Sequence, residues 1–279
     1  MSTLFRFLEH EHRLVAAFFP WDATLTVTSY DPDRVPLAGT YSGHRSIRSY
    51  FRELFRAIDI HDLNVQYQLA DDDHVSSHVR LVATVRSTGK TLDAELVYVF
   101  RFGRHGRIDE CRVFYDTQVW TRAFTPGGPE HVSDLKNPTD DHQVVPTEHD
   151  VEGLVNTVYD NFYAGNIPAV LELLSPDAEV YFKGDPATYP YAGHYTGIEG
   201  MLQFVQNLAG TAQPYNIERF YVTDGDRTDV VLFEEWTVFA TGKSYHVHTV
   251  NSWRVGDDGL LLGFSNYPDS LEIEQAYIP

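Results

Sequence analysis

The chain has 279 residues and carries 21 Lys and Arg against 40 Asp and Glu, which gives a formal net charge of −19. Nucleic acids and anionic membranes are bound through clusters of Lys and Arg, and the sequence contains no such cluster. No apolar run approaches the roughly 18 residues of a membrane span, and the first residues do not have the pattern of a signal peptide. The single cysteine, Cys111, cannot form an internal disulfide. We therefore expect a cytoplasmic protein with neither a nucleic-acid nor a membrane partner.

The first half of the chain predicts a short helix followed by strands. The helix covers about residues 2–10, and the segment PLAGTYSG stands at 36–43. A strand-rich stretch with Gly-containing turns includes residues 87–108. Residues 125–147 are rich in Pro and Gly and lack apolar periodicity, which is typical of a linker.

The second half begins with two predicted helices. The first is indicated by a helical period that stops before Gly165; its apolar residues stand at 151, 154, 155, 158, 159 and 162. The second covers 167–178 and carries Pro168 in its first turn, where proline is tolerated.

The rest of the second half predicts one more helix within a set of strands. A strand at 179–182 leads to the segment PYAGHYTG at 190–197, and the third helix covers 197–209. Four further strands, joined by Gly-containing turns, are predicted at 215–223, 227–240, 243–255 and 259–269.

The two halves repeat one another. Pro36 matches Pro190 at an offset of 190 − 36 = 154, and Gly89 matches Gly242 at an offset of 242 − 89 = 153. The offset of 153 also aligns Phe100 with Trp253, Gly106 with Gly259, and Asp116 with Asp269. Self-similarity over this length indicates duplicated domains, which we place at 1–124 and 148–279.

The order of these elements, with the repeated P-aG-Y-G and tGk segments, resembles a SnoaL-like domain of the nuclear transport factor two-like, ketosteroid isomerase-like superfamily. The resemblance covers nearly all of 148–271 and, more weakly, 1–120. It implies an α+β fold of two cone-shaped domains. In each, a curved antiparallel sheet wraps around about three helices and leaves an apolar pocket open at one end.

The resemblance predicts the fold better than the function, because this superfamily includes isomerases, cyclases, epoxide hydrolases, dehydratases and non-catalytic binding modules. We expect the second domain to bind a small, apolar, oxygenated molecule of a polyketide- or terpenoid-like kind. If the protein is an enzyme, the resemblance implies cofactor-free and metal-free acid/base chemistry: cyclisation, isomerisation, dehydration or epoxide opening. The alternative is a non-catalytic ligand-binding or interaction module.

Asn251 is the first candidate for this chemistry. If Trp253 faces the interior of the cone, strand alternation places Asn251 there too. In ketosteroid isomerase-like members the equivalent residue is acidic and donates a hydrogen bond to a developing oxyanion, which an amide can also do. However, the general-base position of those members falls near Phe182 and the oxyanion Tyr near Val158, beside Tyr159, so steroid-type isomerisation is not supported. The alternative for Asn251 is an inward polar residue satisfied by Tyr or water.

Two carboxylates are further catalytic candidates. Asp185 lies at the mouth of the expected pocket, where burial could make it a general base. Asp269 ends the last strand, where SnoaL-like cyclases carry an acidic catalytic residue. Both recur in the first domain, which favours structural alternatives: a turn that Asp185 begins and a cap formed by Asp269.

Aromatic and polar residues of the second domain complete the expected site. His194 and Tyr163 are candidates for acid/base chemistry, and a lining with hydroxyl and N–H groups suits a flat, ring-bearing ligand. The expected ligand-binding residues are Tyr159, Phe162, Tyr191, Tyr195, Trp236, Tyr245, Trp253, Asn266 and Tyr267.

His246 and His248 should share the outer face of their strand. A metal would need a third ligand, and no suitable pattern is present. Their counterparts in the first domain are Asp93 and Glu95, so we hypothesise an internal pseudo-dimer in which these pairs approach, with further homo-oligomerisation left open.

The repeated segments TGKT at 88–91 and TGKS at 241–244 resemble the end of a phosphate-binding loop. The earlier glycine of that motif is absent, since Thr84 and Thr237 stand in its place. We predict that both segments are turns between strands.

Overall fold

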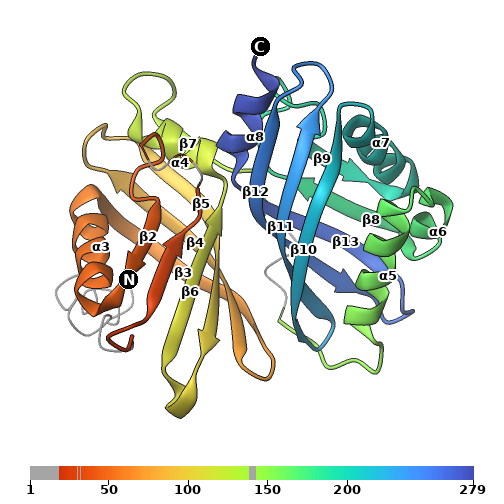
Figure 1. The fold of residues 1–279 in the computed structure, drawn as a ribbon, viewed down its shortest axis with the longest axis horizontal. Coiled ribbons are helices and arrows are strands. Elements are labelled where there is room, and N and C mark those ends of the chain that lie inside the picture. The colour runs from red at the N-terminus through yellow and green to blue at the C-terminus, as the bar shows by residue number, and fades with distance from the viewer. Residues whose placement is uncertain (1–18, 30, 32, 138–142) are drawn as a thin grey trace. The chain divides into compact units, whose positions relative to one another are not determined.

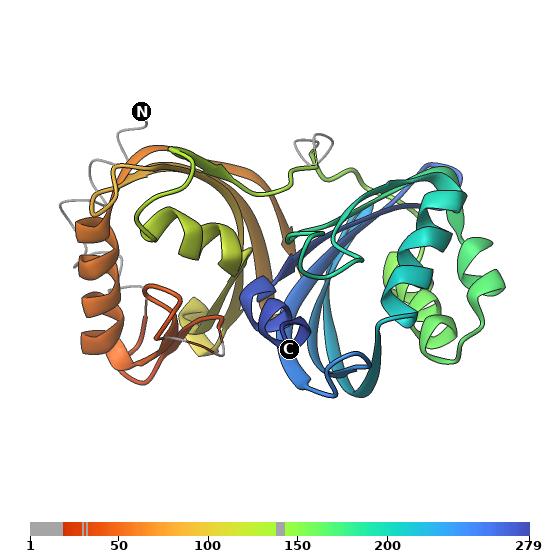
Figure 2. The same ribbon diagram turned by 90° about the horizontal axis from the view of Figure 1, so that it is seen from above.

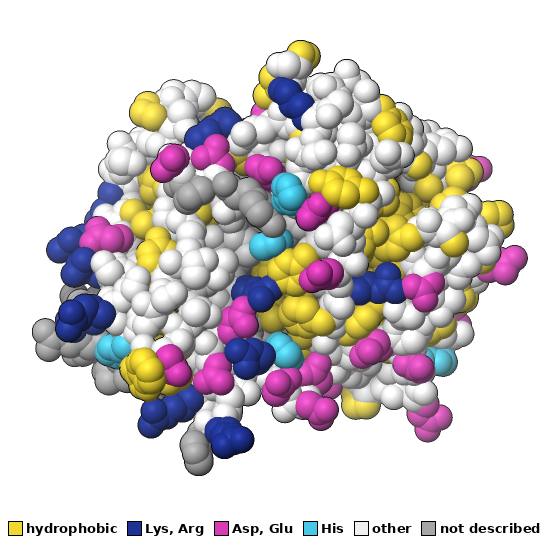
Figure 3. Space-filling view, viewed as in Figure 1, with side chains coloured by type: hydrophobic (Ala, Val, Ile, Leu, Met, Phe, Trp, Pro, Cys, Tyr) yellow, Lys and Arg dark blue, Asp and Glu magenta, His cyan; other side chains and the backbone are white. Residues whose placement is uncertain are grey.

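A computed structural model describes residues 19–29, 31, 33–137 and 143–279, so the helix expected at 2–10 lies outside the described residues. The chain forms two compact units: unit 1, with residues 1–68 and 72–134, and unit 2, with 69–71 and 135–279. None of the helices in the described part is both long and apolar enough to cross a membrane. On the face in Figure 3, Lys and Arg side chains lie scattered among Asp and Glu.

Each unit is a sheet with a few helices, as Figure 1 shows, which confirms the predicted α+β class. Unit 1 has sheet order β2-β1-β6-β5-β4-β3, with β7 added beside β5. Its described elements are β1 (Thr24–Val27), β2 (Gly39–Ser42), α3 (Gly43–Ala57), β3 (Ile58–Ala70), β4 (His74–Val85), β5 (Thr91–Phe102), a 3-10 turn (Arg104–Gly106), β6 (Ile108–Tyr115), α4 (Thr117–Phe124) and β7 (His131–Ser133).

Unit 2 repeats this plan with sheet order β10-β11-β12-β13-β8-β9. Helices α5 to α7 lie together on one face of this sheet, as Figure 2 shows. Its elements are α5 (Val151–Tyr163), α6 (Ile167–Leu171), β8 (Leu174–Phe182), β9 (Gly193–Thr196), α7 (Gly197–Ala209), β10 (Ala212–Asp224), β11 (Arg227–Val238), β12 (Ser244–Val255), β13 (Leu261–Pro268) and α8 (Ser270–Tyr277).

The sheets are mixed rather than wholly antiparallel, which corrects one detail of the prediction. Strand β8 runs parallel to β13, and β1 runs parallel to β6. In unit 2 the cause is the connection: β8 follows α5 and α6 and enters the sheet beside its last strand. Strand β7 also runs parallel to its neighbour β5, and the other pairings with a described register are antiparallel.

Helix α5 forms where the apolar period predicted it. The Asp150 side chain accepts a hydrogen bond from the Gly153 amide at 2.9 Å and so caps the first turn. The chain leaves the helix through Gly165, whose φ of 74° favours glycine. The next helix, α6, ends at Leu171 and is shorter than predicted, because Pro176 disfavours helix before it and the chain has already entered β8.

The repeated P-aG-Y-G segment has a backbone requirement in both units. Gly43 and Gly197 begin α3 and α7 with φ values of 78° and 70°. A Cβ at Gly43 would lie 2.8 Å from the Trp21 carbonyl oxygen, and one at Gly197 would lie 2.9 Å from the Pro176 carbonyl oxygen. Glycine is therefore needed where the short strand turns into the helix.

Candidate functional site

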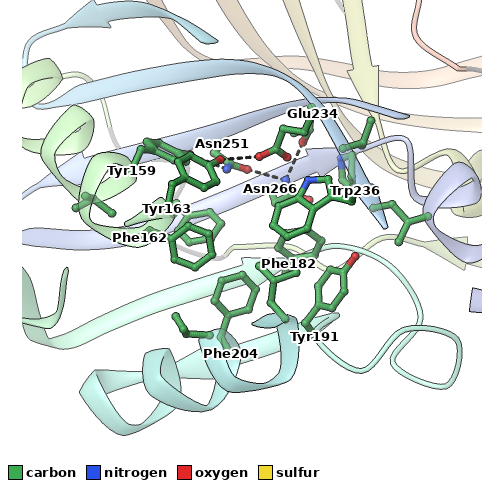
Figure 4. A pocket seen from close by; sticks show the side chains of 18 of the residues that line it. Tyr159, Phe162, Tyr163, Phe182, Tyr191, Phe204, Glu234, Trp236, Asn251 and Asn266 are labelled. Atoms are coloured by element: carbon green, nitrogen blue, oxygen red, sulfur yellow. Dashed lines mark hydrogen bonds between the residues drawn. The ribbon is translucent and has the colours of Figure 1, made fainter. Parts of the chain in front are cut away.

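Unit 2 contains a cavity of about 80 Å³ between helices α5 and α7 and strands β11 to β13. Most of its lining is apolar, and several of its aromatic side chains are labelled in Figure 4. The lining residues are Val158, Tyr159, Phe162, Tyr163, Val170, Phe182, Tyr191, Met201, Phe204, Val205, Leu208, Glu234, Trp236, Tyr245, Val247, Thr249, Asn251, Trp253, Phe264, Asn266, Pro268 and Ile273.

Strand β12 contributes alternate residues to this cavity, as the sequence predicted. The lining takes every second residue of the strand: Tyr245, Val247, Thr249, Asn251 and Trp253. His246 and His248 are not part of it. The alternation of a strand thus correctly placed Asn251 inside the unit.

Asn251 belongs to a buried hydrogen-bond network. Its Nδ2 donates to the Tyr159 hydroxyl at 2.7 Å, and Trp253 Nε1 donates to the same hydroxyl at 3.2 Å. Asn266 Nδ2 donates to Asn251 Oδ1 at 2.6 Å and to Thr249 Oγ1 at 2.7 Å. With these amide orientations Tyr159 accepts twice, so its own proton is available to a further acceptor.

The hydroxyl in this network belongs to Tyr159, the neighbour of Val158, near which the oxyanion Tyr of ketosteroid isomerase-like members was expected to fall. Helix α5 turns the Tyr159 side chain towards β12, where its ring also lies edge-on to Trp253 at 6.1 Å between centroids. Burial raises the pKa of the Tyr159 hydroxyl above its ordinary value, while the Asn251 and Trp253 hydrogen bonds act in the opposite direction. The hydroxyl is accordingly a neutral hydrogen-bond donor at physiological pH.

Glu234 was missed by the sequence analysis and is the one carboxylic acid among the described residues that line the cavity. The Tyr163 hydroxyl donates to its Oε1 at 2.7 Å, as Figure 4 shows. Burial raises the pKa of Glu234, and hydrogen bonds from Tyr163 and Trp236 act against that rise. A signal was present in the sequence: Glu234 has the same strand parity as Trp236, which was expected inside.

Three predicted acid–base residues lie elsewhere. Asp185 is in a turn, where its Oδ1 accepts from the Ala187 amide at 2.9 Å. Asp269 is buried at the N-cap position of α8. His194 stacks on Tyr181 at 4.2 Å between ring centroids and lies 3.2 Å from a Glu179 oxygen. None of the three lines the cavity.

The predicted aromatic set is divided. Tyr195 and Tyr267 do not line the cavity. The Tyr195 ring packs on the ring of Phe204, which is a lining residue. The Lys183 ammonium group lies over the Tyr267 ring, 4.7 Å from its centroid. The members that the structure brings together around the cavity are Tyr159, Phe162, Tyr163, Tyr191, Trp236, Tyr245, Trp253 and the amide Asn266.

Unit 1 also contains a cavity, of about 120 Å³. No Asp or Glu occurs among the described residues that line it, and the tyrosine hydroxyls and the tryptophan N–H are its polar groups. These residues are Tyr50, Phe51, Leu54, Phe55, Ile58, Ile60, Leu63, Leu81, Leu96, Tyr98 and Trp120.

Comparison with known proteins identifies the same repeat. The family model for the SnoaL-like domain matches residues 7–111 and again 155–263. Among solved structures, an NTF2-like protein from Burkholderia xenovorans is 20% identical, covers 46% of this chain and 95% of its own, and has a TM-score of 0.43. An NTF2-like protein from Burkholderia thailandensis is 24% identical, with coverages of 46% and 96% and a TM-score of 0.41. No curated protein matches the chain.

Proposed function

Because the chain belongs to the SnoaL-like domain family, with one copy in each half, we propose that unit 2 binds a compact, largely apolar, oxygenated molecule and moves a proton on it. The observation that carries this proposal is Glu234, a carboxylic acid in a cavity whose lining is mostly apolar and aromatic. A raised pKa keeps such a group close to the protonation change that general acid/base catalysis needs.

The size of the cavity limits the ligand. Its volume of about 80 Å³ is below that of an engineered protein cavity of roughly 150 Å³ that binds benzene. This conformation has room for a ligand smaller than one benzene ring. A ring-bearing ligand would require side chains to move, and a larger polyketide- or terpenoid-like molecule would require larger movements. The aromatic walls offer flat apolar contact to such a ring.

The polar groups support isomerisation over the other reactions of the superfamily. The Glu234 carboxylate would take a proton from the carbon beside a ligand carbonyl. The electron pair of that C–H bond becomes a C=C bond, and the carbonyl oxygen becomes an enolate oxygen that accepts the Tyr159 proton as a hydrogen bond. In a ligand with a C=C bond between its β and γ carbons, the enolate is conjugated with that bond. Return of the proton from Glu234 to the γ carbon then moves the C=C bond to the α,β position and completes the isomerisation.

Epoxide opening is less well supported. The epoxide-opening cyclases with tandem architecture use a pair of carboxylates in each active cone, whereas the described lining of this cavity contains Glu234 alone. Asp185 with Glu199 is the nearest match to such a pair in the sequence, but Glu199 lies in the first turn of α7, where it complements the helix N-terminus.

The test is hydrogen–deuterium exchange on a panel of compact ketones, such as cyclohexanone and 2-cyclohexenone, followed in D2O by proton NMR. The protein should accelerate exchange of the protons next to the carbonyl. The Glu234→Gln variant keeps the shape and the acceptor for Tyr163 but has no proton acceptor of comparable basicity, so exchange should fall by about 10²- to 10⁴-fold. Equal exchange by wild type and variant, with binding of the ketone demonstrated, would exclude Glu234 as the base.

A non-catalytic binding module is the second candidate. It is favoured by the network around Asn251, in which Tyr159, Asn266 and Trp253 already satisfy much of each other's hydrogen bonding. Binding of the ketones without any exchange above the buffer rate would select this function.

A further inference from the structure

One wall of the unit 2 cavity is formed by the C-terminal helix α8. Of the residues in this helix, Ile273 lines the cavity, and its side chain is buried. The neighbouring Leu271 is buried as well but is not part of the lining. Ile273 is thus the residue through which α8 meets a bound molecule.

The position of α8 is fixed by the TGKS turn, the motif that the function above leaves unexplained. Thr241 Oγ1 donates to the Ala276 carbonyl oxygen at 2.7 Å, and Lys243 Nζ donates to the Ile278 carbonyl oxygen at 2.6 Å. Both acceptors lie at the C-terminal end of α8, where carbonyl groups lack helical partners and a cation is favourable. The turn therefore clamps the end of the helix.

The TGKT turn of unit 1 makes the same clamp on helix α4. Thr88 Oγ1 donates to the Ala123 carbonyl oxygen at 2.7 Å, and Lys90 Nζ donates to the Thr125 carbonyl oxygen at 2.6 Å. Each of these four positions is 153 residues before its counterpart in unit 2. The two turns hold equivalent helices in the same way, so the motif positions a cavity wall and not a phosphate.

With the helix held identically, the residue that faces the cavity is free to differ. At the position of Ile273, unit 1 has Trp120, which lines the unit 1 cavity. The Trp120 indole N–H donates to the Pro36 carbonyl oxygen at 3.0 Å, and the ring stacks on Phe124 at 5.5 Å between centroids. The framework thus accommodates side chains of very different size at this one wall position.

We propose that Ile273 is a specificity-determining residue, which sets the length of the molecule that the unit 2 cavity accepts. This inference rests on the proposed function, since it requires a ligand in that cavity. A shorter side chain at position 273 lengthens the space against a wall that the clamp keeps in place. The preferred ligand should lengthen accordingly, in proportion to the carbon atoms removed.

The experiment measures the affinity of a homologous series, phenol to 4-hexylphenol, for the full-length chain by titration calorimetry. In wild type, affinity should rise about four-fold for each buried methylene up to a limiting chain length and then fall. Ile273→Val should extend the limit by about one carbon and Ile273→Ala by about two to three carbons. The graded shift separates a wall residue from a general loss of stability.

Leu271→Ala is the matched control, because it removes a similar volume from the same helix on a side that does not line the cavity. It should lower the unfolding temperature and leave the preferred chain length unchanged. If Ile273→Ala binds the series with the wild-type preference, or if Leu271→Ala shifts that preference equally, Ile273 does not set ligand length. If neither wild type nor Ile273→Ala binds any phenol, the proposed ligand site itself fails, and the role of Ile273 with it.

Discussion

In unit 2, Glu234 pairs with Val247 across β11 and β12; in unit 1, Leu81 holds the same register position and pairs with Ala94 across β4 and β5. Leu81 lines the cavity of unit 1 as Glu234 lines that of unit 2. The other polar residues of the unit 2 cavity can be aligned with unit 1 at the same offset of 153. Thr249, Asn251 and Asn266 then correspond to Leu96, Tyr98 and Val113.

The comparison teaches which features the fold needs. Both units keep the glycine that begins the helix, the TGK clamp and a cavity. Unit 1 builds this framework with Leu and Val where unit 2 has Glu234, Thr249 and Asn266. The fold therefore does not require these polar residues. Burying them costs desolvation free energy, and only the unit 2 cavity keeps them despite that cost. That asymmetry is the argument for a chemical role in unit 2.

The converse substitution gives the largest expected effect on stability. Leu81→Glu places a carboxylic acid in the unit 1 cavity, at a strand position with almost no solvent exposure. We expect the free energy of unfolding at neutral pH to fall by about 2–4 kcal/mol, because a buried side chain is lost and a charge is desolvated. Denaturant titration at pH 7 measures it.

Val65→Glu is the control, because Val65 lies in the same unit on β3 and is 51% exposed. It should change the free energy of unfolding by no more than about 0.5 kcal/mol. A loss of the same small size for Leu81→Glu would mean that the unit 1 cavity accepts an acid, and the proposed contrast between the two cavities would not hold.

Asn266→Val installs the unit 1 residue of this position in unit 2 and should have an intermediate effect. It removes the donor that Asn251 Oδ1 and Thr249 Oγ1 accept from, which costs about 1–2 kcal/mol of unfolding free energy. Because Asn251 then no longer holds the Tyr159 hydroxyl in one orientation, we expect ketone exchange to fall about ten-fold. Denaturant titration and the NMR exchange assay measure the two effects.

The double variant Asn251→Leu with Asn266→Val separates stability from function. Replacing both partners by apolar groups leaves fewer buried groups unpaired, so stability should recover while exchange stays low. If exchange recovers together with stability, the amide network only supports the fold.

The sequence alone predicted most helices and strands and the residues of one wall of the site. Apolar period predicted α5, and strand alternation placed Asn251 and Trp253 inward, because both depend on local backbone geometry that repeats along the chain. The second helix was predicted too long, because its apolar residues continue into β8 and the helical period does not mark where α6 ends.

The catalytic candidates were harder, because their roles depend on where a side chain points in three dimensions. Asp185 and Asp269 stand at the ends of elements, where a carboxylate can serve a turn or a cap as readily as a pocket. Glu234 follows no motif and has Glu235 beside it, so composition alone gives no reason to choose one of the two. Strand parity with Trp236 separates Glu234 from Glu235, but only the structure shows its contact with Tyr163.

The smallest effect concerns the pH dependence of stability. Burial raises the pKa of Glu234 in the folded protein above its ordinary value of 4.5, so the folded state binds the proton more tightly than the unfolded state. The contribution of Glu234 to stability is therefore full below pH 4.5 and declines as the pH rises through the raised pKa. The glutamine of the Glu234→Gln variant does not titrate. As the pH rises through this window, the free energy of unfolding of the variant should therefore increase relative to that of wild type, and above the window the difference should stay constant.

Denaturant titrations of wild type and Glu234→Gln from pH 4 to pH 8 measure this difference, and Ile273→Val, which alters the same cavity without changing a titrating group, supplies the baseline. A difference that stays constant over the range would mean that Glu234 titrates alike in the folded and unfolded chains. A difference that moves in favour of wild type would mean that the folded protein prefers the carboxylate. In either case the cavity would not raise the pKa of its acid, and unit 2 would differ from unit 1 by a polar wall without the tuned base that proton transfer requires.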